Sequence, residues 1–264
     1  MRADVVVGSF SSAGQVRDDN QDAFGYFEPD THEELAAKGR LVVVADGMGG
    51  EAAGDVASRL AVESVRNSYF GDVSDDPSQA LRRSLEAANR AIYERASAEP
   101  GLAGMGTTCT ALVIRSEEAH LAHVGDTRAY LIRQGSITRL TRDHSLASSG
   151  RANVLTRALG VAAASLDVDV LHPPVATQRG DAWLLCSDGL WGQVTDDELL
   201  EAALSSRDVQ DVCRRLVACA NGRGGPDNIT VQLVRVEAGA EGDGAASQAP
   251  VRMWRRLRRL LGVP

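Results

Sequence analysis

The residues best suited to do chemistry in this 264-residue chain are four aspartates, each within two residues of a glycine or an asparagine. They are Asp22, Asp46, Asp188 and Asp227, in the segments 17–22, 44–50, 186–191 and 226–230. A carboxylate at a strand end costs free energy to desolvate unless it binds a cation or accepts hydrogen bonds. Several such carboxylates that converge would form an all-oxygen site for divalent metal ions. The four segments therefore predict metal-assisted hydrolysis.

Each of these residues also has a simpler interpretation when it is taken alone. An Asp-Gly pair after a strand is most often a turn, and Asn20 and Asn228 are equally suited to turns or helix caps. Arg17 can form a surface ion pair with Asp18 or Asp19. The recurrence of the pattern in four segments favours the metal site, and the simpler interpretations remain open at this point.

The spacing of apolar residues predicts the elements that must position these aspartates. An apolar run at 41–45 predicts a buried strand, and helices are predicted at 52–70, from Asp76-Pro77 onward, after the capping box at Thr195, and at 209–220. A period of two predicts strands at 110–115, 119–124, 127–133, 136–140, 167–171, 182–186 and 228–236. Because strands and helices do not alternate as βαβ units, we expect an α+β fold. Its centre would be an antiparallel β-sandwich flanked by helix pairs, in α-β-β-α layers.

Composition and charge favour a compact domain that binds cations rather than nucleic acid. The net charge of −8 becomes −13 for residues 1–250, because the five arginines of residues 251–264 are the only charged residues there. An acidic body argues against nucleic acid as the main partner. There is no apolar run of about 18 residues and no secretory signal, so we expect a cytoplasmic protein. The four cysteines lack metal-binding spacing, which argues against zinc and a disulfide framework.

Six motifs occur in a fixed order along residues 8–236. They are residues 17–22, Asp46-Gly47-Met48-Gly49-Gly50, Gly106-Thr107-Thr108, Gly125-Asp126-Thr127-Arg128, Ser187-Asp188-Gly189 and Asp227-Asn228. In this order they resemble the metal-dependent protein phosphatases of the protein phosphatase 2C type, and most closely their bacterial branch. The resemblance implies two packed antiparallel sheets flanked by helix pairs, in a catalytic domain at residues 1–237.

The same resemblance implies a role for each motif residue. Its implied metal ligands are Asp22, Asp46, Asp188, Asp227 and the Gly47 carbonyl, with Asp126 at a third, weaker metal and Arg17 as the phosphate-binding residue. Oxygen ligands indicate two Mn²⁺ or Mg²⁺ ions. The implied reaction is hydrolysis of phosphoserine or phosphothreonine in proteins, in which a metal-bridged hydroxide attacks phosphorus in line without a covalent phosphoenzyme. The implied partners are phosphorylated proteins and a cognate Ser/Thr kinase.

Two other functions remain as alternatives: a pseudophosphatase that binds phosphoproteins without turnover, and another binuclear phosphoester hydrolase. The complete set of ligands favours catalysis, and the absence of a nucleoside-pocket motif favours protein substrates. For Asp126, entry into a hairpin is an alternative explanation.

Two departures from the family pattern concern the substrate. Met48 stands where many eukaryotic relatives have a histidine that is proposed to protonate the leaving group, and residues 146–154 replace a longer flap.

The C-terminal residues differ in character from the rest of the chain. Residues 238–250 are rich in alanine, glycine and small polar residues, which predicts a flexible linker. Residues 251–264 predict a basic amphipathic helix with Met253, Trp254, Leu257, Leu260 and Leu261 on its apolar face. Such a helix suits an acidic partner or an anionic membrane, which would place the protein peripherally at the inner membrane face. The alternative is a tail that docks on the acidic body or remains disordered.

Deletion of residues 251–264 tests the membrane interpretation. We expect the deletion to abolish co-sedimentation with anionic liposomes, because it removes both the arginines and the apolar face. Turnover of a small phosphate ester should not change. Liposome binding that survives the deletion would refute the membrane contact.

Overall fold

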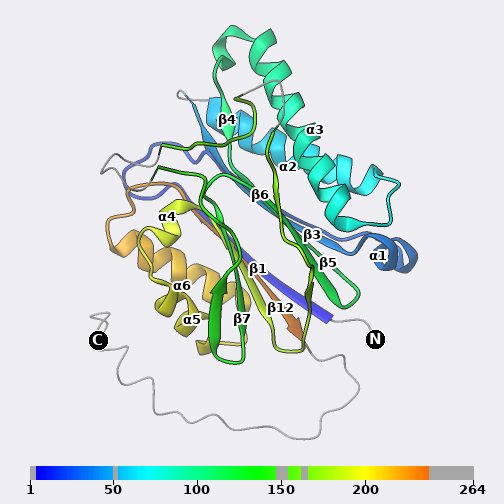
Figure 1. Cartoon of the computed structure of the whole chain (residues 1–264). Coiled ribbons are helices and arrows are strands. Elements are labelled where there is room, and N and C mark those ends of the chain that lie inside the picture. The colour runs from blue at the N-terminus through cyan, green and yellow to red at the C-terminus, as the bar shows by residue number, and fades with distance from the viewer. Residues whose placement is uncertain (1–3, 50–52, 147–153, 162–165, 238–264) are drawn as a thin grey trace, which may run out of the picture.

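Two antiparallel sheets pack face to face in the computed structural model, which describes residues 4–49, 53–146, 154–161 and 166–237 (Figure 1). The first sheet has the strand order β1 (Asp4–Ser12), β12 (Ile229–Glu237), β11 (Ala182–Cys186), β7 (Arg128–Arg133) and β8 (Ser136–Arg139). The second has the order β10 (Val175–Ala176), β6 (Glu118–Val124), β5 (Cys109–Arg115), β3 (Arg40–Met48) and β2 (Asp22–Phe27). Two short strands extend it, since β4 (Gly106–Thr107) pairs with β3 and β9 (Asp169–Val170) pairs with β6.

Helices cover the outer face of each sheet (Figure 1). The second sheet carries α2 (Ala53–Gly71) and α3 (Pro77–Ala98), and the first carries α5 (Asp196–Ser205) and α6 (Val209–Gly222). Three shorter elements are α1 (His32–Lys38), the 3-10 helix η1 (Pro100–Leu102) and α4 (Asp188–Trp191). Local signals account for two of the helix starts. Asp76 caps α3 by accepting from the N–H groups of Ser78 and Gln79, and Thr195 and Glu198 form the expected capping box of α5.

The apolar side chains form three layers of core, which confirms the predicted α-β-β-α arrangement. Trp183 and Leu112 lie fully buried in the layer between the two sheets. Val65 and Leu85 belong to the layer under α2 and α3, and Leu216 belongs to the layer under α6. The sheets thus act as a rigid frame whose strand ends can hold polar residues.

The expected elements largely agree with the observed ones. The strand predicted at 182–186 is β11, and the helix predicted at 52–70 is α2 with its start and end one residue later. The run at 167–171 was too long a prediction, since only Asp169–Val170 pairs as β9, at the edge of β6. Residues 147–153 of the shortened flap, the linker at 238–250 and the helix predicted at 251–264 lie outside the described residues. Within the described ranges, no helix has the length and apolar character needed to cross a bilayer.

Candidate active site

Two of the predicted ligands face each other across neighbouring strands. Asp22, the first residue of β2, lies directly opposite Asp46 of β3 in the strand register. Side chains in such a pair have Cβ atoms about 5 Å apart, and like charges there are destabilising. The Oδ2 atom of Asp22 accepts a hydrogen bond of 2.7 Å from Ser187 Oγ, whereas its buried Oδ1 atom has no hydrogen-bond partner. One oxygen of this carboxylate is therefore available to a cation.

The pKa values of these carboxyl groups reflect this crowding. Burial raises the pKa of Asp22 from 3.8 to about 7, and the charges of Asp188 and Asp227 act in the same direction. Burial and the charge of Asp22, followed by that of Asp188, raise the pKa of Asp46 well above 3.8, although Asp46 keeps some solvent exposure. The ionised forms of these groups are thus costly unless positive charge is supplied.

Close backbone approach explains the glycine that follows Asp46. A Cβ atom on Gly47 would lie 2.1 Å from the carbonyl oxygen of Gly54 in α2, and the Gly47 N–H donates to the Gln21 carbonyl at 3.1 Å. The residue after Asp188 is equally confined, since a Cβ atom on Gly189 would lie 2.0 Å from the Asn228 carbonyl oxygen. Both glycines let separate segments of the chain converge beside the aspartates.

Arg17 pairs with a predicted ligand rather than with Asp18 or Asp19. Its Nη2 atom donates to Asp227 Oδ2 at 2.8 Å, and this hydrogen bond is the main cause of its raised pKa. The Arg17 side chain is 57% exposed. It lines a cleft of about 470 Å³ together with Gly47, Met48 and Asp227. Arg17 is therefore placed to bind an anion that enters the cleft.

Asn228 has a larger structural role than the sequence indicated. Its Oδ1 atom accepts from the Gln21 N–H at 2.8 Å, and its Nδ2 atom donates to the carbonyls of Asp19 and Ala13 at 2.8 and 3.0 Å. It thereby ties the loop that precedes Asp22 to the start of β12. Its position next to Asp227 was the available signal, but an asparagine in that place is equally typical of a turn.

Asp126 lies beside the other acids, between β6 and β7. The residue is 3% exposed, and burial raises its pKa to about 7, with contributions from Asp188 and Asp143. Trp191 Nε1 donates to the Asp126 carbonyl at 2.9 Å, which places this turn beside α4, the helix that begins with Asp188. The fold thus brings together Asp22, Asp46, Asp126, Asp188 and Asp227, with Arg17 at the rim.

The oxygen atoms of these aspartates suit divalent cations, although they do not form a complete coordination site as they stand. In the described part of the chain, no three Asp, Glu, His or Cys side chains are gathered closely enough to hold an ion as they stand. The aspartates nevertheless supply only oxygen atoms, and a cation would satisfy the unpartnered Oδ1 of Asp22. It would also offset the repulsion between Asp22 and Asp46.

The two histidines of β6 are packing residues on opposite faces of the strand. His120 Nδ1 lies 2.9 Å from Ser78 Oγ of α3, whereas His123 Nδ1 lies 2.8 Å from Thr110 Oγ1 on β5. Burial lowers the pKa of His123 to about 4, so its ring is neutral at physiological pH.

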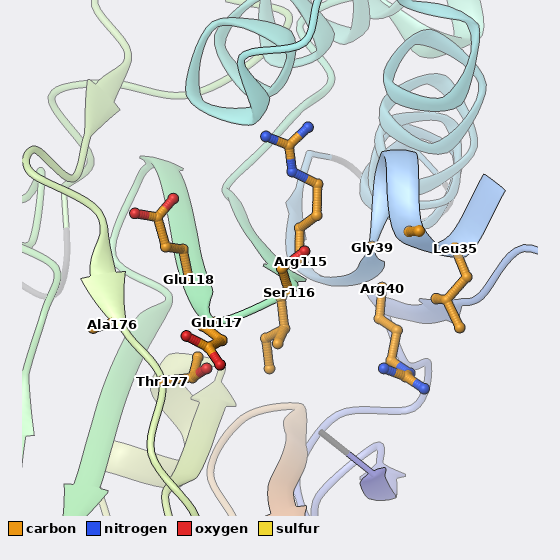
Figure 2. A pocket seen from close by; sticks show the side chains of 11 residues that line it. Leu35, Gly39, Arg40, Arg115, Ser116, Glu117, Glu118, Ala176 and Thr177 are labelled. Carbon is orange, nitrogen blue, oxygen red and sulfur yellow. The ribbon is translucent and has the colours of Figure 1, made fainter. Parts of the chain in front are cut away.

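A larger hollow lies away from these aspartates (Figure 2). It has a volume of about 680 Å³ and is lined by Arg40, Arg115, Glu117 and others around the β5–β6 hairpin. Arg40 begins β3, whereas Asp46 lies six residues further along this strand, about 20 Å away at the usual rise. The hollow therefore belongs to the other end of the sandwich.

Comparison with known proteins identifies the family. Residues 12–233 match the family model described as Protein phosphatase 2C. The chain belongs to the protein phosphatase 2C family. It is 34% identical over 252 residues to the serine/threonine phosphatase stp of Listeria monocytogenes, covering 88% of this chain and 96% of that protein. It is 37% identical over 241 residues to the serine/threonine protein phosphatase PstP of Mycobacterium tuberculosis, covering 86% of this chain and 44% of that protein.

Solved structures of protein phosphatase 2C relatives share this fold. The catalytic domain of PstP in complex with two manganese ions superposes with a TM-score of 0.75 at 33% identity, covering 89% of this chain and 99% of that domain. PppA, a regulatory component of the type VI secretion system in Pseudomonas aeruginosa, gives a TM-score of 0.75 at 37% identity, covering 88% of this chain and 97% of PppA.

The raised pKa values predict how pH affects the stability of the metal-depleted protein. Between pH 6.5 and 8, the folded state gradually loses the protons on Asp22 and Asp126, whose pKa values are about 7, while these groups are already ionised in the unfolded chain. Since the folded state binds more protons, its stability should fall as pH rises. His123 opposes this trend only weakly, because its ring is neutral in the folded state and no more than half protonated in the unfolded chain at or above its ordinary pKa of 6.5.

Thermal unfolding in EDTA at pH 6.5, 7.25 and 8 measures this effect. The unfolding temperature should decrease across the series, and Asp22→Asn should flatten the slope. Added Mn²⁺ should raise the unfolding temperature most at pH 8, where proton release opposes binding least. An unfolding temperature that rises with pH in EDTA would contradict the assignment of these two groups.

Proposed function

We propose that this protein phosphatase 2C member hydrolyses phosphoserine and phosphothreonine in proteins. The observation that carries the proposal is the opposition of Asp22 and Asp46 across β2 and β3, with one buried carboxylate oxygen left without a partner. This arrangement favours divalent cations beside a cleft that is lined by Gln21 and Gly47, the neighbours of the two aspartates, and by Arg17. The relatives named as serine/threonine phosphatases support the same substrate class.

The site residues would have separate roles in binding metal and phosphate. Asp22, Asp46, Asp188, Asp227 and the Gly47 carbonyl would hold two Mn²⁺ or Mg²⁺ ions, and Asp126 would contribute to a third. When bound, the ions supply positive charge and a water of lowered pKa for in-line attack on phosphorus. Arg17 would bind the phosphoryl oxygens through its planar guanidinium group and hold the substrate in line.

A covalent route through cysteine receives no support. Cys109 is followed six residues later by Arg115, which is the spacing of cysteine phosphatases. Cys109 is fully buried in β5, however, and burial raises its pKa to about 12. A thiol that stays protonated and inaccessible is a poor nucleophile. Direct hydrolysis without a phosphoenzyme is therefore the mechanism that we propose.

The decisive test is phosphate release from a phosphothreonine peptide by the wild type and Asp188→Asn, with and without Mn²⁺. We expect activity that depends on metal and that falls at least about 100-fold in the variant, because a lost ligand removes several kcal/mol of transition-state stabilisation. Asp197→Asn, at an exposed position in the first turn of α5, is the matched control and should retain activity. A folded wild type without turnover in Mn²⁺ would instead favour the pseudophosphatase.

Replacement of Arg17 tests phosphate binding separately. We expect Arg17→Lys to lower kcat/KM for the phosphopeptide by about 10-fold or more, since an ammonium group cannot bind two phosphoryl oxygens in a planar fork. Arg214→Lys, on the exposed face of α6, is the matched control. Steady-state kinetics at saturating Mn²⁺ measure both. Unchanged kcat/KM in Arg17→Lys would argue that the Asp227 pair is the only role of this side chain.

A further inference from the structure

The turn that carries Asp126 is held in place by a histidine from the segment after β8. The Gly125 N–H donates to His144 Nδ1 at 3.1 Å, and the His144 backbone N–H donates to the Gly125 carbonyl at 2.7 Å. Gly125 adopts φ +112°, and a Cβ atom there would lie 2.4 Å from the Cβ of Thr108. The turn is therefore fixed between Thr108 on one side and His144 on the other.

Both ring nitrogens of His144 are engaged, so the orientation of the ring is determined. Because Nδ1 accepts from a backbone N–H, the proton of the neutral ring lies on Nε2, which donates to Asp169 Oδ2 at 3.1 Å. The other oxygen of Asp169 accepts from Arg157 Nη1 at 2.8 Å. His144 is only 5% exposed, and its ring packs 4.9 Å from that of His123. It therefore has no access to a substrate in the cleft.

A second side chain holds the same turn from α4. Trp191 lies three residues after Asp188, and its Nε1 atom donates to the Asp126 carbonyl at 2.9 Å. The guanidinium carbon of Arg128 lies 3.6 Å from the centre of the Trp191 ring. Arg128 in turn forms two hydrogen bonds with Asp143, of 3.0 and 2.7 Å. The backbone of Asp126 is thus tied directly to the helix that begins with Asp188.

We propose that His144 and Trp191 are positioning residues that hold the Asp126 carboxylate close to Asp188 and thereby strengthen binding of the third ion. The two carboxylates repel each other, so the turn must be held against that repulsion. Loss of either hydrogen bond lets the turn move away, and the ion then loses a well-placed ligand. This inference rests on the proposed function, in which Asp126 is a metal ligand.

Mn²⁺ binding measured by calorimetry and by the electron paramagnetic resonance of free Mn²⁺ tests the inference without reference to turnover. We expect Asp126→Ala to abolish the weakest binding event. His144→Ala and Trp191→Phe should weaken that event about tenfold and leave the tighter events unchanged. His144→Asn should recover most of the affinity, since its Oδ1 can replace Nδ1 as the acceptor for Gly125. His32→Ala, in the distant helix α1, is the matched histidine control.

Two outcomes would overturn the inference, and they are distinguishable. If Asp126→Ala weakens the third event while folded His144→Ala and Trp191→Phe both bind Mn²⁺ as the wild type does, the two residues do not position Asp126. If Asp126→Ala itself binds as the wild type does, Asp126 is not a ligand and the inference fails with that assignment. In the second case the test of Asp188→Asn still decides whether the protein is a phosphatase. Thermal unfolding confirms that each variant is folded.

Discussion

The repulsion between Asp22 and Asp46 is the constraint on which the rest of the site depends. A sheet that places two carboxylates directly opposite each other sacrifices some stability unless cations or hydrogen bonds compensate. Ser187 Oγ donates a hydrogen bond to one oxygen of Asp22, and Thr108 Oγ1 accepts a hydrogen bond of 2.9 Å from the Asp46 N–H. The remaining unfavourable energy is relieved when a proton or a cation binds. The repulsion that lowers the stability of the fold is therefore also the reason for its affinity for metal.

The site lies where the two sheets meet, and this explains why its supporting residues come from distant segments. Ser187, at the end of β11 in the first sheet, reaches Asp22 in the second. Asn228 makes the corresponding link from the start of β12 to Gln21. The motif loops converge at the end of the sandwich where β4 and α4 lie (Figure 1). The contacts that pack the two sheets together therefore also determine where the candidate ligands lie.

The sequence indicated the family and the candidate acids better than it indicated their geometry. The Asp-Gly and Asp-Asn pairs identified the acids because few other roles explain their joint occurrence, and β11 was predicted correctly because its apolar run is buried on both faces. The strands β1 and β2 were not predicted. In β2 the small and aromatic residues Asp22–Phe27 show no clear period, and its place comes from pairing with β3. The contacts of Trp191 and His144 with the Asp126 turn could not be predicted, since they join residues that are distant in sequence.

The side chains that line the cleft constrain how the leaving group can be protonated in the proposed reaction. None of the described residues that line the cleft is a histidine, and Met48 is one of them. His123 and His144 lie close to the Asp126 turn in space, but both are buried and engaged in hydrogen bonds. In the proposed reaction, the proton for the departing serine or threonine oxygen would therefore come from a carboxylic acid or from water. Since the cleft rim carries Asp18 and Asp19 and is open to solvent, water is the more abundant donor, and the pH dependence of kcat should lack the limb that a catalytic imidazole would produce.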